Sequence, residues 1–106
     1  MASDMASQED TVKQAALFSA LADPTRLKLV KILSQQRSPD ALCVNALAQR
    51  IGITQSAVSQ HLRILKNHGL VTGKRRGYYV HYFVNHEGLR HCHHMVSIVL
   101  NIKRSH

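Results

Sequence analysis

The chain has 106 residues, 44% of them hydrophobic, which allows one folded domain and excludes a chain that is disordered or membrane-embedded by composition. Fourteen lysines and arginines against six acidic residues give a net charge of +8, which disfavours acidic partners and favours a polyanion. No acidic residue lies between Asp40 and Glu87, so this stretch carries only positive charge. Nucleic acid is the leading candidate partner, and a generally basic protein without one is the plain alternative.

The start of the chain and its cysteines indicate the compartment. Residues 1–10 are polar and acidic, without the basic start and apolar stretch of a signal peptide. The strongly apolar stretch over residues 95–100 is far shorter than the ~18 residues of a membrane-spanning helix. Cys43 and Cys92 do not make a disulfide framework. We therefore expect a cytoplasmic protein with free thiols and no membrane partner.

The first part of the chain is predicted to be helical. After a flexible tail over residues 1–8, a broad apolar side indicates a helix over about residues 10–22. Asp23 and Pro24 begin a second helix, because Asp accepts hydrogen bonds from the first amides and Pro needs no amide partner at the first helical position. The polar, Pro-containing residues 36–40 end this helix in a loop.

A helix-turn-helix is predicted over about residues 44–68. Its first helix spans about residues 44–51 and ends at Gly52, because only glycine enters the left-handed conformation at low cost. Thr54 is the natural N-cap of the next helix, over about residues 55–67. A short helix, a tight turn with glycine and a second helix define this motif.

The second helix of the motif has an apolar and a polar side. Val58, Leu62 and Leu65 recur at i, i+4 and i+7, so they face the core. The opposite side has no acidic group, and its Gln, Ser and Arg side chains suit base edges and phosphates in the major groove, although an ordinary solvated face would carry similar groups. The candidate DNA-binding residues of this helix are Gln55, Ser56, Ser59, Gln60 and Arg63.

A basic β-hairpin is predicted over about residues 70–84. Residues 70–74 and 78–84 have the composition of strands, and residues 74–77 are expected to form the tip between them. Clustered cations on a protruding ribbon favour the DNA backbone or minor groove, and a tip kept soluble by its charge is the plainer alternative. The candidate DNA-binding residues of the hairpin are Lys74, Arg75, Arg76 and Tyr78.

A last helix is predicted over about residues 86–103, with Asn85 as its cap and apolar positions every three or four residues. The fold class is therefore mainly α with a β-hairpin wing, a single winged helix-turn-helix domain over residues 9–106. The expected order is four helices, two strands and one helix. A domain of this size buries only about 60–65% of its unfolded surface, which favours a core shared in a homodimer.

Three segments are similar, in this order, to the ArsR/SmtB family of metal- and stress-responsive repressors. They are FSALADPTRLKLVKIL (residues 18–33), ALCVNALAQRIGITQSAVSQHLRILKNHGLV (residues 41–71) and KRRGYYVHYFV (residues 74–84). The resemblance implies a homodimer formed by the helices over residues 10–22 and 86–103. It also implies repression, in which the dimer sits on a partly palindromic double-stranded DNA operator until an inducer lowers its affinity.

The resemblance leaves the inducer open. Arsenic- and cadmium-type members carry a Cys-Val-Cys pattern, but this chain has Cys43-Val44-Asn45, so that site is predicted to be broken. Zinc-type members place their ligands on the last helix, and no pair here reproduces the family spacing. The histidines and cysteine of this helix are nevertheless candidates for Zn(II), Ni(II), Co(II) or Cu, with a solvated polar face as the alternative. These candidate metal ligands are His86, His91, Cys92, His93 and His94.

Two further signals and two further classes of function are alternatives to a metal-released repressor. Cys43 and Cys92 are candidates for a redox or thiol pair if their Cα atoms come within ~7 Å, and the histidines allow DNA binding to depend on pH. A metal-buffering or trafficking protein using the His-rich helix would need no operator. No nucleophile-and-base arrangement, phosphate loop or carboxylate pair is found in the sequence, so we do not expect an enzyme.

Overall fold

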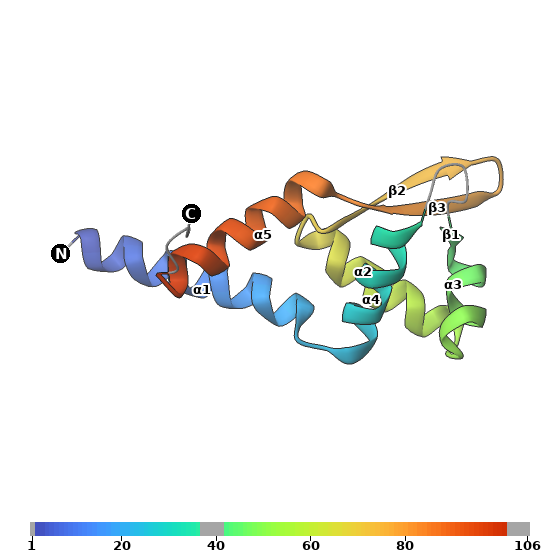
Figure 1. The fold of residues 1–106 in the computed structure, drawn as a ribbon, viewed down its shortest axis with the longest axis horizontal. Coiled ribbons are helices and arrows are strands. Elements are labelled where there is room, and N and C mark those ends of the chain that lie inside the picture. Colours follow the sequence, from blue (N-terminus) through green and yellow to red (C-terminus); the bar gives the residue numbers. More distant parts are fainter. Residues whose placement is uncertain (1, 37–41, 102–106) are drawn as a thin grey trace, which may run out of the picture.

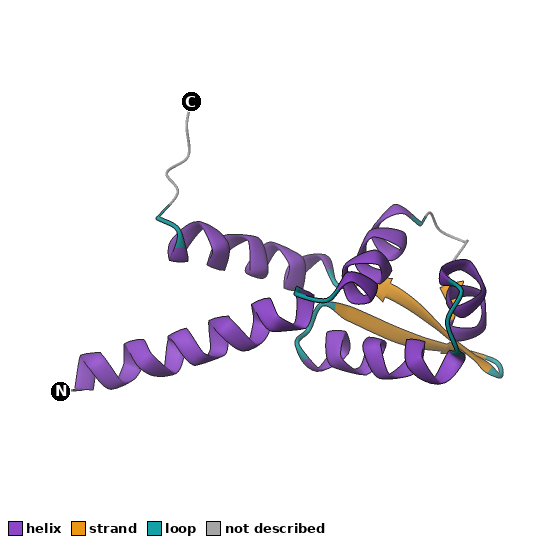
Figure 2. Cartoon of the chain, turned by 90° about the horizontal axis from the view of Figure 1, so that it is seen from below, coloured by secondary structure: helices purple, strands orange, loops and turns teal. Residues whose placement is uncertain are grey.

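A winged helix-turn-helix carrying a long helical arm is seen in the computed structural model, which describes residues 2–36 and 42–101, with side chains from residue 10 onward. The helices α1 and α5 leave the body in the same direction, and we call this pair the arm (Figures 1 and 2). The hairpin of β2 and β3 projects at the opposite end of the molecule (Figure 1). Within the described ranges no helix combines the length and apolar character required to cross a membrane. The elements are α1 (Ala2–Leu21), α2 (Pro24–Gln35), β1 (Leu42–Cys43), α3 (Val44–Ile51), α4 (Gln55–Asn67), β2 (Val71–Arg76), β3 (Tyr79–Val84) and α5 (His86–Val99).

The helix boundaries follow the predicted caps. Asp23 Oδ2 accepts a hydrogen bond from the Arg26 amide at 3.0 Å, and Thr54 Oγ1 accepts one from the Ala57 amide at 3.1 Å. Gly52 has a φ of 83° and donates its amide to the Ala48 carbonyl, which ends α3 as expected. These caps fix the tight turn between α3 and α4, and this turn sets how α4 leaves the body.

Both ends of the arm differ from the prediction. The helix α1 begins at Ala2, so the prediction that the first helix starts near residue 10, after a flexible tail over residues 1–8, placed its start too late. Residues 2–9 include Ala, Met, Gln and Glu and neither Gly nor Pro, so nothing in them interrupts a helix. The helix α5 ends at Val99 rather than near residue 103, because Asn101 takes a left-handed φ of 52°. Residues 102–106 lie outside the described part.

The sheet contains a strand that the sequence did not indicate. Its order is β1-β3-β2, and Leu42 and Cys43 of β1 pair antiparallel with Tyr82 and His81 of β3. Gln36 holds this edge in place, because its side-chain amide donates to the Tyr82 carbonyl at 2.6 Å and accepts from the Leu42 amide at 3.0 Å. The loop expected over residues 36–40 lies, beyond Gln36, outside the described residues.

The first strand of the hairpin extends further than predicted, and the tip is correspondingly shorter. β2 continues to Arg76, which pairs with Tyr79, so the expected tip over residues 74–77 is wrong for its lysine and arginines, which belong to the strand, and right for Gly77. The turn consists of Gly77 and Tyr78, and Gly77 supplies the positive φ, 64°, that a two-residue hairpin turn requires.

One apolar core joins all the helices to the sheet. Val58, Leu62 and Leu65 of α4 are buried in it, as the helical spacing predicted. Since one side of α4 is committed to this core, its opposite side must face away from the body. The other large buried side chains of the core are Leu29, Leu33, Leu47, Leu70 and Val71.

Candidate nucleic-acid interface

The outward face of α4 carries every DNA-binding candidate predicted for that helix. All of these side chains are exposed, and the sequence of α4 has no acidic residue. Gln55 Nε2 donates to Asn45 Oδ1 at 3.1 Å, which ties the start of α4 to the start of α3. The exposed side chains are Gln55, Ser56, Ser59, Gln60 and Arg63. This face presents the amide, hydroxyl and guanidinium groups that hydrogen bond to base edges and phosphates.

The wing, defined as β2, β3 and their turn, presents cations on both of its faces. Lys74 and Arg76 share one face with Phe83. The Nζ atom of Lys74 lies 5.7 Å from the centroid of the Phe83 ring, and the Cζ atom of Arg76 lies 5.6 Å from it. Contacts of this kind at exposed sites are worth about 0.5–1 kcal/mol, so they favour these positions of the two cations. Arg75 lies on the other face, because successive side chains of a strand point to opposite faces. Tyr78, at the turn, is 98% exposed.

A hollow of about 320 Å³ connects the wing with the start of the helix-turn-helix. Gln55 of α4 and Tyr78 of the wing both line it, so these two elements border one surface and do not lie on opposite sides of the molecule. A long anion lying along this surface can contact both. The residues that line the hollow are Cys43, Val44, Asn45, Gln55, Tyr78, Tyr79, Val80 and Tyr82.

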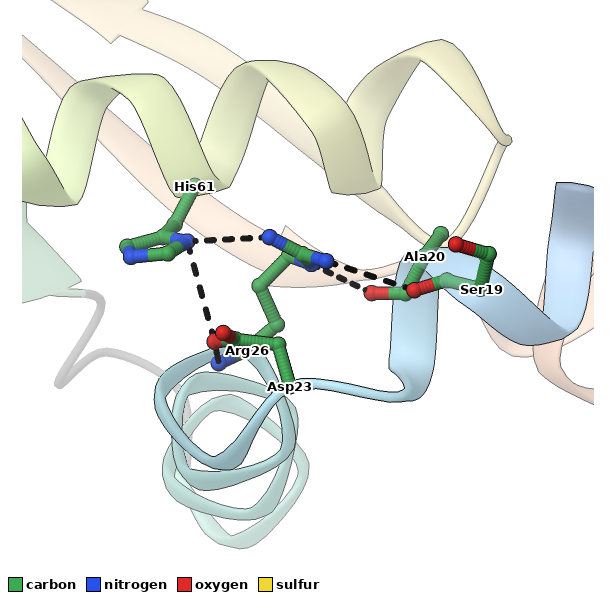
Figure 3. A network of polar contacts seen from close by, with 5 residues as sticks. All are labelled: Ser19, Ala20, Asp23, Arg26 and His61. Carbon is green, nitrogen blue, oxygen red and sulfur yellow. Dashed lines mark hydrogen bonds and ion pairs between the residues drawn. The ribbon is translucent and has the colours of Figure 1, made fainter.

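A polar network holds α4 against the end of the arm (Figure 3). The Arg26 guanidinium donates to the carbonyls of Ala20 (2.6 Å) and Ser19 (3.2 Å) and reaches His61 Nδ1 of α4 at 3.3 Å. Asp23 Oδ2 lies 3.9 Å from the same His61 nitrogen. The hydrogen bond from the Arg26 amide lowers the pKa of Asp23, and the positive charge of Arg26 adds to this effect. Asp23 therefore remains a charged cap at neutral pH.

The predicted metal ligands do not gather within one chain. Cys92 is buried in the core, and this burial raises the pKa of its thiol, which disfavours the thiolate that binds metals. His86, His91, His93 and His94 are exposed along α5. Across the described ranges no group of three or more His, Cys, Asp or Glu side chains is placed to hold a metal ion. Within a single copy, the described side chains therefore do not form a metal centre.

The two cysteines are free and belong to distant elements. Cys43 is half-buried in β1, beside the wing, whereas Cys92 lies in α5, in the arm. Figures 1 and 2 place these elements at different positions along the long axis of the molecule. One copy of the chain therefore gives no support to the predicted thiol pair.

Four residues of this region were missed from the sequence. Asn45 had been considered only as the replacement of a cysteine, and Phe83 only as a strand residue. His61 carries no local signal and Arg26 only a weak one, since the contact between them joins residues 35 positions apart in the chain. A cation at i+3 after the Asp23 cap is the weak hint that the sequence offers for Arg26.

Comparison with known proteins agrees with this geometry. Residues 23–72 match the model of a family described as bacterial regulatory protein, arsR family. The transcriptional repressor SmtB homolog of Synechocystis sp. is 42% identical over 79 residues, which are 74% of this chain and 57% of that protein. The cadmium resistance transcriptional regulatory protein CadC homolog of Staphylococcus aureus is 34% identical over 88 residues, which are 78% of this chain and 70% of that protein. The chain thus spans little more than half the length of the first relative.

A solved structure confirms the predicted fold class. It is described as the homodimeric winged helix-turn-helix DNA-binding domain of a possible ArsR-family transcriptional regulator from Mycobacterium bovis. It superposes with a TM-score of 0.67 at 28% sequence identity, and the match covers 95% of this chain and 90% of that one.

Proposed function

Because the chain belongs to the ArsR family of bacterial regulatory proteins, we propose that it is a transcriptional repressor that binds double-stranded DNA as a homodimer. The observation that carries this proposal is the exposed, acid-free face of α4 beside a basic wing, with both bordering one hollow. In the complex α4 is the recognition helix in the major groove, and the wing follows the backbone or the minor groove.

The arm supports the homodimer. Val12 of α1 is 68% exposed, and Ile98, Val99 and Leu100 at the end of α5 are 55%, 47% and 63% exposed. A single copy leaves this apolar surface in water, whereas a second copy of the arm covers it by the hydrophobic effect. The dimer then presents two copies of α4 about one helical turn of DNA apart, roughly 34–36 Å, to a partly palindromic operator.

The test of the proposal is a gel-shift titration of the promoter fragment upstream of the protein's own coding sequence, with random DNA of equal length as the control. We expect steep weakening of both complexes as salt rises, with a large margin in favour of the promoter at every salt concentration. Equal affinities for the two fragments would contradict a specific repressor.

Replacing Gln60 by alanine tests base recognition by α4. Gln60 is exposed in the half of α4 that leads into the groove, and loss of a bidentate contact with adenine should weaken operator binding by about 1–3 kcal/mol. Binding to random DNA should hardly change. The matched control is Gln35→Ala, an exposed glutamine at the end of α2. If Gln60→Ala weakened operator and random complexes alike, Gln60 would not read bases.

Replacing Arg75 and Arg76 together by alanine tests the wing as a phosphate clamp. Both side chains are exposed in β2, so their loss should weaken binding to all DNA and reduce the slope of log K against log salt by about 0.9 per lost phosphate contact. The control, Lys28→Ala with Lys31→Ala, removes the same charge from two exposed sites on α2, outside the arm. An unchanged slope in the wing variant would exclude the clamp.

The proposed DNA binding does not depend on a metal ion. The names of the relatives connect one of them with cadmium resistance, but in the described residues of one chain the side chains do not form a metal site. A metal inducer would need ligands from a second copy of the chain or from outside the described ranges, and the choice among Zn(II), Ni(II), Co(II) and Cu stays open. Metal buffering by the His-rich helix has no observation in its favour.

A further inference from the structure

The side chain of Arg26 joins the arm to α4. Its Nε and Nη2 atoms donate to the carbonyls of Ala20 and Ser19 at the end of α1, and Nη1 reaches His61 Nδ1 on α4. The contacts run in different directions from one planar group (Figure 3). A guanidinium presents its donors in a fixed fork, so it holds these partners at defined angles, whereas apolar packing alone constrains them less.

The position of Arg26 near the start of α2 explains why its side chain, and not one from α1, binds the carbonyls at the end of α1. The last turn of α1 leaves carbonyl groups without helical partners, and that turn contains no basic residue of its own. Asp23 fixes the start of α2 by accepting from the Arg26 amide, which sets the base of the side chain. Arg26 therefore supplies hydrogen-bond donors to the carbonyls at the end of α1 and reaches His61 of α4 with the same guanidinium group.

The partner on α4 is also specific. His61 is half-buried on the flank of α4, between the buried Leu62 side and the outward face. Its Nδ1 lies 3.3 Å from Arg26 Nη1 and 3.9 Å from Asp23 Oδ2, so two residues at the start of α2 face this one nitrogen. His61 thus fixes the rotation of α4 without touching the groove-facing side chains. The contact positions the recognition helix and does not itself read DNA.

We propose that Arg26 is a positioning residue that sets the angle between the arm and α4, and with it the spacing of the two half-sites that the dimer accepts. This inference rests on the proposed function, because it assumes that the arm forms the dimer and that α4 enters the groove. The two-fold symmetry of a homodimer applies any change of this angle twice, once in each copy. Successive major grooves lie a fixed distance apart, so the angle selects the operator.

The experiment measures spacing preference with a set of operators. The half-sites are kept, and the segment between them is shortened or lengthened by one or two base pairs. Dissociation constants are measured for the parent chain and for Arg26→Lys, Arg26→Met, His61→Ala and the double variant Arg26→Met/His61→Ala. Lysine keeps the charge but cannot reproduce the fork, so it separates geometry from charge. Lys28→Met, an exposed cation on the same helix, is the matched control.

We expect the parent and Lys28→Met to prefer one spacing, and Arg26→Lys, Arg26→Met and His61→Ala to lower this preference by roughly threefold or more. Arg26→Met should lower the preference much less in the His61→Ala background than in the parent, since the link from the arm to α4 runs through the contact between these two residues. Circular dichroism and sedimentation show whether each variant is a folded dimer. If Arg26→Met does not fold, Arg26→Lys and His61→Ala decide the outcome.

The possible failures are distinguishable. If the parent binds no operator better than random DNA, the proposed function itself is wrong. If the parent binds its operator but accepts all spacings equally, or if folded Arg26 and His61 variants keep the parental preference, the positioning role is wrong while the repressor stands.

Discussion

Replacing Leu62 by alanine is expected to lower the free energy of unfolding by about 2–5 kcal/mol. Leu62 is 1% exposed and lies in α4 between Val58 and Leu65, within the core that joins the helices to the sheet. Removing its branched end leaves a cavity directly behind the recognition face, and neighbours that are themselves close-packed cannot fill it completely. A domain of this size has only about 5–15 kcal/mol to lose, so the effect should be visible as a large drop in the denaturation midpoint.

The measurement is chemical denaturation followed by circular dichroism at one fixed protein concentration, because the stability of a dimer depends on concentration. Leu27→Ala is the matched control, since it deletes the same atoms from a side chain on α2 that is 43% exposed. Its effect should stay below about 1 kcal/mol. Similar losses in the two variants would mean that α4 is not anchored by this core.

Local chemistry explains what could be predicted from the sequence. The caps at Asp23, Thr54 and Asn85 and the turn at Gly52 act over three or four residues, so they are visible in the sequence and were confirmed. The buried side of α4 follows from a helical spacing in the same way. The opposite, polar face of α4 was predicted to bind DNA. DNA contact by each of its residues stays a prediction.

Pairing with distant residues explains what was missed. The strand β1 exists because Leu42 and Cys43 meet β3 and because Gln36 bridges to Tyr82, and neither partner is near in sequence. The wing tip was misplaced because a run of cations resembles a turn, although register with β3 continues through Arg76. The contact of Arg26 with His61 likewise needs the tertiary fold to bring α2 and α4 together.

Gly88→Ala is the second substitution with a large expected effect, and its sign is opposite to the usual one. A glycine inside a helix is normally less stable than alanine by about 0.5–1 kcal/mol. Here a Cβ on Gly88 would overlap the carbonyl oxygen of Gly69, and it would lie 2.9 Å from the carbonyl carbon. We expect a loss of about 1–3 kcal/mol, as for other overpacked sites, measured by the same denaturation experiment.

The neighbouring Glu87→Ala supplies the control, because it changes an exposed side chain on the same helical turn without adding an atom near Gly69. Its effect on the free energy of unfolding should lie within about 0.5 kcal/mol. A variant Gly88→Ala that is more stable than the parent would show that the two segments are not in close contact.

The reason for expecting a loss lies in which atoms collide. The Gly69 carbonyl is part of the main chain, and the main chain also fixes the position of the added Cβ. No side-chain rotation can therefore relieve the overlap. The amide of Asn85 also donates to the Leu70 carbonyl at 2.9 Å, which fixes the start of α5 against the segment that ends α4. Relief therefore requires α5 to move relative to α4. Because α5 belongs to the arm, Gly88→Ala should also weaken operator binding, even though Gly88 lies outside the proposed DNA-contacting face.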